Sequence, residues 1–295
     1  MSEPDLGPQY KGDNAFKRRA RLHQSRFRVE QLGLLAYRDF GNRLVTADAL
    51  AGRNFYTAWP GLFDAVTARY EAGDTRLYWD MLRSEHMPFN LFVPLRDERA
   101  LLEAWVHRVT DERPRHVRRV EVEFAPAPKS AYLDDSTSFD AFVEYEREDG
   151  GSGGVGVEVK YTEGEYPYGK QEQRRMFSDA SPYHHVHARS GMYVVGSIPT
   201  LRTERFKQVW RNHLLGEAMV QRGELARFTS VTIFPAGNEH FVRVMKEYPL
   251  LLRPEMRARV VAQTFDEFLE VLGSAGGNDR VAPWLAYLRR RYAHP

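Results

Sequence analysis

The chain has 295 residues, of which 42% are hydrophobic and 28% charged, a composition that is ordinary for a folded globular protein and argues against gross disorder. It contains no cysteine, which excludes disulfides, thiolate nucleophiles and cysteine-ligated zinc or iron–sulfur sites and is consistent with a cytoplasmic protein. The formal net charge of +2 does not by itself indicate nucleic-acid binding, so such a function must be judged from where the charges lie.

No segment is typical of secretion or of a membrane span. Residues 1–14 are polar and include prolines, without the apolar core of a signal peptide. Later segments all fall short of the roughly eighteen uninterrupted apolar residues that a membrane helix needs. We therefore expect a cytoplasmic protein with no membrane partner.

A basic amphipathic helix is predicted near the N-terminus. Seven basic residues and a single acid lie within residues 11–28, and Asp13 or Asn14 is suited to cap a helix. Apolar residues recur there at three- and four-residue steps, which predicts a narrow apolar stripe with arginines over the remaining surface. Two interpretations stay open, a solvated helix face or a phosphate-binding surface. The candidates for contact with nucleic acid are Lys17, Arg18 and Arg21.

Helical patterns continue up to residue 109. Residues 61–84 read as two helical pieces broken near Gly73, and residues 87–95 as a buried connector with two prolines. The apolar spacing of residues 97–109 predicts a further helix. We expect residues 1–95 to form a helical N-terminal region packed on a core of residues 96–295, the two together making one structural domain.

Three strands are predicted next, over residues 117–124, 139–145 and 155–161. The glycine-rich segment 149–154 suits a hairpin turn between the last two strands. Facing residues in an antiparallel hairpin have numbers with a constant sum. Placing Asp140 opposite Glu158 sets the midpoint at residue 149, inside this segment, so the turn permits that pairing.

The rest of the chain alternates helices and strands. We predict helices over residues 201–225, 240–252, 264–272 and 281–292, and strands over residues 228–234 and 259–263. This order predicts an α/β fold with a central mixed sheet flanked by helices.

The strongest candidate for chemistry is the set Asp140, Glu158 and Lys160. In the predicted hairpin all three share one face, because alternate strand positions point to the same side. The other face would carry Ala141, Val143, Val157 and Val159. Two converging carboxylates suit Mg²⁺, and an ammonium beside them stabilises the charge that develops when a phosphodiester is hydrolysed. Lys160 also stands out because only seven of the 42 basic residues are lysines, and it alone follows an acid by two residues.

This pattern resembles the PD-(D/E)XK, or restriction-endonuclease-like, nucleases, whose signature is an acid near the start of one strand and a (D/E)-x-K triplet on the next. Here the acid is Asp140 and the triplet is Glu158-Val159-Lys160. Phe139 stands where the superfamily's name has proline, a departure that many members share. Residues 82–95 and 158–163 look like those of a bacterial group of restriction endonucleases in this superfamily.

The resemblance implies a restriction-endonuclease-like core and an Mg²⁺-dependent endonuclease, with Mn²⁺ as a substitute, that cuts DNA by metal-activated water in defence against foreign DNA. Asp140, Glu158 and the backbone carbonyl of Val159 would hold the metal, and Lys160 would act on the water. RNA is not excluded as a substrate. A homodimer is reasonable, because cutting both strands usually needs two sites.

The resemblance also implies accessory residues. Glu85 would be an additional catalytic acid on an earlier helix, with Glu103 as a competing candidate. Lys170 and Gln173 would lie on a helix that begins just after the triplet, where related nucleases use basic residues or glutamine to reach phosphate. A solvated helix face is the alternative for these two residues.

Other interpretations remain open. A surface hairpin with a simple charge pair predicts that Glu158 and Lys160 face bulk water. A non-catalytic nucleic-acid-binding protein or an interaction subunit could use the same scaffold. Residues 184–187 include three histidines that either ligate a metal from a strand or belong to a polar loop.

Overall fold

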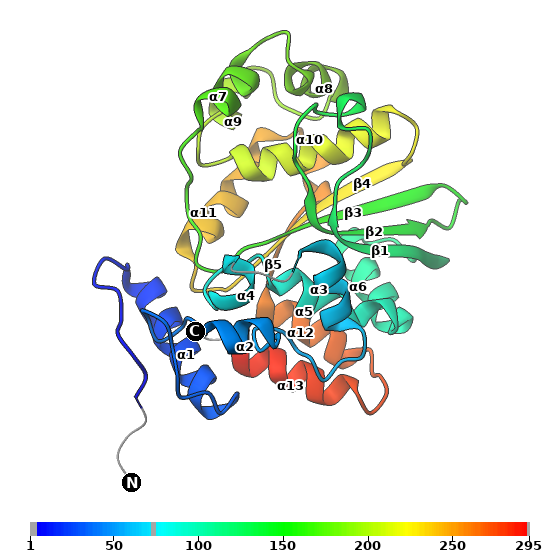
Figure 1. The fold of residues 1–295 in the computed structure, drawn as a ribbon. Helices are drawn as coiled ribbons and strands as arrows, with labels where there is room; N and C mark the ends of the chain where they lie inside the picture. Colours follow the sequence, from blue (N-terminus) through cyan, green and yellow to red (C-terminus); the bar gives the residue numbers. More distant parts are fainter. Residues whose placement is uncertain (1–4, 72–74, 294–295) are drawn as a thin grey trace.

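In the part of the chain that the computed structural model describes, residues 5–71 and 75–293, a mixed sheet of five strands forms the centre of the molecule (Figure 1). The strands are β1 (His116–Phe124), β2 (Phe139–Glu146), β3 (Ser152–Val159), β4 (Arg227–Phe234) and β5 (Val260–Thr264). They lie in the order β1-β2-β3-β4-β5, antiparallel from β1 to β3 and parallel from β3 to β5. The predicted α/β class with a mixed central sheet is confirmed.

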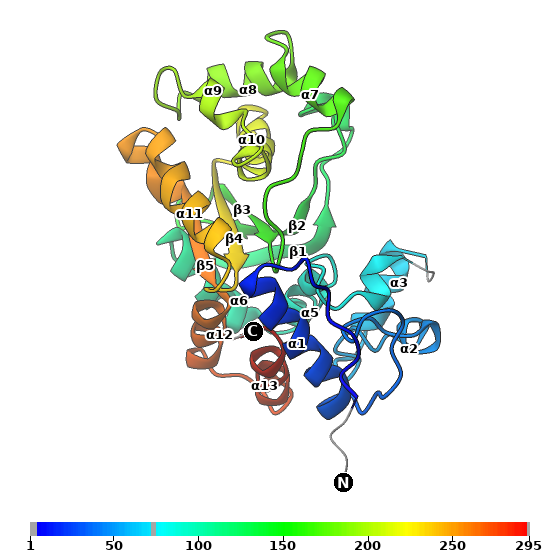
Figure 2. The ribbon, with the colours of Figure 1, turned by 90° about the vertical axis from the view of Figure 1, so that its left-hand side faces the viewer.

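Helices cover both faces of this sheet. They are α1 (Ala15–Glu30), α2 (Thr46–Leu50), α3 (Leu62–Arg69), α4 (Arg76–Trp79), α5 (Met87–Phe92), α6 (Arg99–Thr110), α7 (Lys170–Phe177), α8 (Pro182–Ser190), α9 (Ile198–Leu201), α10 (Lys207–Gln221), α11 (Glu239–Glu247), α12 (Phe265–Ser274) and α13 (Val281–Tyr292). Helix α10 lies on one face and α5, α6 and α12 on the other, as Figure 1 shows. Helices α7, α8 and α9 lie beyond α10, whereas α1 and α13 lie side by side at the opposite end of the molecule (Figure 2).

Each face of the sheet carries its own apolar core. The four residues predicted to pack away from the acids, Ala141, Val143, Val157 and Val159, are all fully buried on the side of α5, α6 and α12. On the other side, Phe142 and Phe228 pack with residues of α10. On the face that carries Asp140 and Glu158, α10 covers Phe142 and Phe228. Further along β2 the same face is polar again, because Glu144 and Glu146 form ion pairs with arginines of β1.

The hairpin of β2 and β3 has the predicted register. Ala141 pairs with Val157, so Asp140 faces Glu158 one step further along. The turn is tighter than predicted, since Gly153 and Gly154 belong to β3. A Cβ atom on Gly153 would lie 2.2 Å from the ring of Tyr145, so the strand needs glycine there.

Most other predicted elements are present with small changes of boundary. The proline-containing segment 87–95 is an exception: it is helix α5 followed by a short 3-10 helix, Pro94–Arg96, rather than a connector. The helix predicted over 201–225 is divided into α9 and α10, and α11 ends before a second short 3-10 helix, Tyr248–Leu251. Two further 3-10 helices are Lys129–Ala131 and Pro254–Arg259. The predicted break near Gly73 falls outside the described residues, between α3 and α4.

Helix α1 docks against the core through polar as well as apolar side chains. Asn14 caps it by accepting a hydrogen bond from the Lys17 backbone N–H. Gln24 is fully buried and donates to the hydroxyl of Tyr161, just after β3, and to the carbonyl of Arg291 in α13. Contrary to the predicted stripe, both Arg21 and Arg28 point inward. These contacts fix the N-terminal helix next to the segment that leaves the predicted site.

No helix among the described residues is long and apolar enough to cross a bilayer.

Candidate active site

The two acids of the predicted site come from the matching ends of neighbouring strands. Asp140 is the second residue of β2, and Glu158 is the last but one of β3. The Asp140 carboxylate accepts a hydrogen bond of 2.6 Å from the backbone N–H of Val159, which ties the side chain of one strand to the backbone of the next. The antiparallel register thus brings the acids together across the hairpin.

Lys160 lies one residue beyond β3 but keeps the alignment of the strand, because its backbone N–H donates to the carbonyl of Ile233 in β4 at 2.8 Å. Its Nζ lies 2.5 Å from Oε1 of Glu158. The side chains of Lys160 and Glu158 are only 7% and 12% exposed. A solvated surface hairpin predicts the reverse, so that interpretation is wrong.

The charges of the three groups act on one another. Burial, followed by the charge of Glu158, raises the pKa of Asp140 well above its usual range, although Lys160 acts in the other direction. Burial alone would lower the pKa of Lys160, but Glu158 and Asp140 outweigh it and the pKa is raised. Lys160 is therefore an ammonium at neutral pH.

Helix α10 holds Glu158 from a second direction. The side-chain amide of Asn212 donates a short hydrogen bond to Oε2 of Glu158. The helix can approach the sheet closely because Gly216 faces the ring of Phe228, where a Cβ atom would lie only 2.2 Å from that ring. Lys160 and Asn212 together fix both carboxylate oxygens of Glu158.

The segment that follows Lys160 is clamped in place. The Glu163 carboxylate accepts hydrogen bonds from the backbone N–H groups of Tyr161, at 2.7 Å, and Ser84, at 2.9 Å. Asn238, which caps α11, donates to the backbone carbonyls of Tyr161 and Glu163. Two distant parts of the chain, around Ser84 and Asn238, therefore hold this segment in place.

A third acid, Glu123 near the end of β1, was missed by the sequence analysis. Val122 pairs with Ala141 and Phe124 with Phe139, so Glu123 lies opposite Asp140. Its pKa is raised, chiefly by burial, and the charge of Glu158 adds to this effect. Glu123 thus belongs to the electrostatic surroundings of the two predicted acids.

A comparison with protein families shows to which superfamily the chain belongs. A model of the PD-(D/E)XK nuclease superfamily matches residues 11–294, almost the whole chain. The chain belongs to this superfamily. The predicted restriction-endonuclease-like fold is thereby confirmed. No curated protein and no solved structure matches the chain.

Glu85 is the first candidate for the accessory acid that the resemblance to PD-(D/E)XK nucleases implies. This residue lies in a turn before α5 rather than on a helix, and its side chain is 43% exposed. Both of its carboxylate oxygens accept hydrogen bonds from Arg83. Its charge nevertheless contributes to the raised pKa of Glu123. Glu103, the competing candidate, is on α6 on the opposite face of the sheet from α10.

The residues predicted to bind nucleic acid fall into two groups. Lys17 and Arg18, on the first turn of α1, and Lys170 and Gln173, on α7, are partly or fully exposed. Arg21 differs, because it is buried with its Nε 2.5 Å from Asp13 and a further hydrogen bond to Asn42. Its inward direction contradicts the prediction that it contacts nucleic acid; it is an internal ion-pair partner instead.

The histidines of residues 184–187 lie on helix α8, neither on a strand nor in a loop. The His187 ring stacks on Tyr193 with 4.3 Å between the ring centroids, and burial lowers the pKa of His187 to about 4. In residues 5–71 and 75–293, no three His, Asp or Glu side chains are arranged as a metal-binding group. His187 is accordingly a packing residue.

The donor set at the sheet end fits a hard divalent cation. Nucleases of this superfamily generally use divalent metals. Mg²⁺ is usually held by one or two carboxylates and keeps waters in its shell, so Asp140 and Glu158 suffice without a third ligand. Burial and the charge of Glu158 raise the pKa of Asp140, and a bound cation would favour its ionised form.

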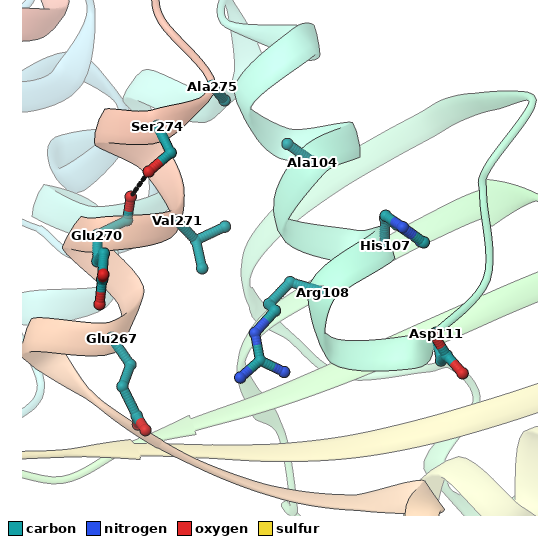
Figure 3. Close-up of a pocket in the computed structure, with 9 residues that line it drawn as sticks. All are labelled: Ala104, His107, Arg108, Asp111, Glu267, Glu270, Val271, Ser274 and Ala275. Carbon is teal, nitrogen blue, oxygen red and sulfur yellow. Dashed lines mark hydrogen bonds between the residues drawn. The ribbon is translucent and has the colours of Figure 1, made fainter.

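A surface depression of about 620 Å³ lies elsewhere, between α6 and α12 (Figure 3). Arg108 points into the space between the two helices, and Glu267 and Glu270 line the α12 side. None of the predicted catalytic or nucleic-acid-binding residues lines this depression. Its size therefore does not mark it as the active site.

Proposed function

We propose that the protein is a divalent-metal-dependent endonuclease that hydrolyses DNA phosphodiester bonds at Asp140, Glu158 and Lys160. The observation that carries this proposal is the ion pair between Lys160 and Glu158, which is almost entirely buried and faces Asp140 across the hairpin. Burying a lysine and two acids at one point is costly for stability alone, which favours a functional reason for the cluster.

Asp140, Glu158 and the backbone carbonyl of Val159 would hold Mg²⁺ or Mn²⁺. The cation, when bound, would neutralise charge on the scissile phosphate and lower the pKa of a water. Asp140 is already oriented by the Val159 N–H group, and Glu158 by Lys160 and Asn212, so little side-chain freedom remains to be lost.

The ammonium of Lys160 would orient the attacking water and stabilise the charge that develops on the phosphate. Its three N–H donors suit both tasks, and its low exposure strengthens each interaction because bulk water is largely excluded. A single preorganised donor of this kind is worth about 3 kcal/mol in the transition state. Loss of Lys160 should therefore reduce cleavage by a factor of about 100 or more.

We propose that the nucleic-acid backbone passes next to this site. A pocket of about 310 Å³ lies between the start of α1, the start of α11 and residues 162–164. Arg19 and Arg243 line it, and both are exposed. Lys17 and Arg18 extend the basic surface along α1, and on α7 we propose Lys170 and Gln173 as further contacts. These groups would bind phosphates without reading sequence.

Cleavage of plasmid DNA tests the proposal. The protein with Mg²⁺ is expected to nick or cut supercoiled plasmid, and Asp140→Asn and Glu158→Gln are each expected to abolish this. Asp135→Asn is a matched control, because Asp135 also forms an ion pair, 3.2 Å from Arg211, but outside the site. Equal cutting by all four proteins would refute the assignment.

The same assay separates the remaining possibilities. Binding without cutting in any divalent metal would favour a non-catalytic nucleic-acid-binding protein, and cutting of RNA alone would change the substrate.

Light scattering with and without DNA tests the proposed homodimer. We also propose a role in defence against foreign DNA, for which the expected result is a reduced plating efficiency of phage that Asp140→Asn abolishes.

A further inference from the structure

We propose that Glu123 is the third acidic residue of this site and strengthens the binding of the divalent cation through the cation's water shell. The inference rests on the proposed function, and it assigns to Glu123 the part that the sequence suggested for Glu85 or Glu103. It follows from the register of the three strands β1, β2 and β3.

The first observation is a row of acids across three strands. The pairs Val122–Ala141 and Phe124–Phe139 flank Glu123 and Asp140, and the pair Ala141–Val157 adjoins Asp140 and Glu158. The register thus aligns the three acids across β1, β2 and β3. Side chains directly opposite one another in a sheet have Cβ atoms about 5 Å apart, and like charges in such positions are destabilising. The ammonium of Lys160 forms an ion pair with Glu158, so the three acids of the row share this one closely placed positive charge.

The second observation is the backbone of Glu123. Its φ angle is +57°, in the left-handed region that non-glycine residues rarely adopt. This conformation costs about 1 kcal/mol for a residue such as glutamate. Residues held in this way cluster at functional sites, where the surrounding structure fixes them.

The third observation is the set of groups around the Glu123 carboxylate. Tyr70 and Arg69 favour the ionised form of Glu123, while the charges of Glu158 and Glu85 oppose it. Burial has the largest effect and raises the pKa of Glu123. Glu123 thus belongs to the same electrostatic cluster as Glu158 and Glu85.

Neighbouring acids lack this combination. Glu85 has both oxygens engaged by Arg83. Glu121, two residues earlier on β1, is paired with Arg119 at 2.7 Å. Because the described acids form no ready group of three ligands, Glu123 is placed outside the inner shell, where Mg²⁺ commonly keeps water.

Binding of Mn²⁺ by the full chain, measured by calorimetry without nucleic acid, tests the inference. Glu123→Gln is expected to weaken Mn²⁺ binding by about tenfold, as loss of an outer-shell partner typically does. Glu121→Gln, the matched control on the same strand, is expected to leave it unchanged. Equal affinity of Glu123→Gln and the wild type would overturn the inference.

Two further variants keep the outcome interpretable. Asp140→Asn is expected to abolish Mn²⁺ binding, and a wild type that binds no Mn²⁺ would overturn the proposed function itself rather than the role of Glu123. If Glu123→Gln melts at a lower temperature than the wild type in the absence of metal, Glu123→Asp is expected to restore most of the affinity by restoring the charge. Failure of that rescue would also overturn the inference.

Discussion

Asn212 donates a hydrogen bond to one carboxylate oxygen of Glu158, while the ammonium of Lys160 lies 2.5 Å from the other. Glu158 is thus held between α10 and its own strand. Asn212→Ala is expected to reduce the rate constant of cleavage by about tenfold with little change in KM, because it frees a group that binds the metal rather than the substrate. Gln208→Ala, one turn earlier on α10, is the control. Steady-state kinetics on a short duplex would show this, and a change in KM alone would contradict the positioning role.

Gly216 controls how closely α10 approaches the sheet. A Cβ atom there would lie 2.2 Å from the Phe228 ring, so Gly216→Ala is expected to lower the free energy of unfolding by about 1–3 kcal/mol. Gly273→Ala on α12 has open space around the new methyl group and should instead be stabilising by about 0.5–1 kcal/mol. Urea denaturation of both variants measures the difference. Equal effects would mean that the approach of α10 does not depend on Gly216.

Asp140→Asn is expected to stabilise the protein in the absence of divalent metal. Asp140 lies between two other acids in the strand register, and the substitution removes one negative charge from the row. An asparagine oxygen can still accept the Val159 hydrogen bond. We expect a gain on the order of 1 kcal/mol in EDTA. A melting temperature below that of the wild type would contradict this account.

Glu217 makes stability depend on pH. Burial raises its pKa from 4.5 to about 7, with Arg259 acting weakly in the other direction. The folded state therefore keeps a proton that the unfolded chain releases, so this contribution is full below pH 4.5 and is lost as the pH rises to about 7. The loss should be about 3 kcal/mol. Glu217→Gln should remove it, and parallel pH profiles of the variant and the wild type would refute the prediction.

The sequence was most informative where the relevant contacts are local. The register of β2 and β3 is set by a short glycine-containing turn. That turn permits only a few registers, and the chemistry of two acids and a lysine favoured the one that places Asp140 opposite Glu158. Glu123 could not be found in this way, because β1 and β2 are joined by residues 125–138 and a long connection does not set a register. Asn212 is one of several polar residues on α10, and its contact with Glu158 depends on tertiary packing.

Prolines and charges misled the prediction in two places. Pro88 lies in the first turn of α5, where a missing N–H costs nothing, so it begins a helix instead of breaking one. Arg21 was expected on the surface because it is charged, but Asp13 and Asn42 satisfy its guanidinium inside the protein. Both errors come from partners or positions that a pattern of residue types does not reveal.

Replacement of Lys160 gives the most direct test of the central claim that Asp140, Glu158 and Lys160 form a nuclease active site. Lys207 is a close control, because it too is buried and its Nζ lies 3.0 Å from a glutamate, Glu172. In plasmid cleavage with Mg²⁺, Lys160→Met is expected to be inactive while Lys207→Met and the wild type cut. Cutting by Lys160→Met at the wild-type rate would contradict the account.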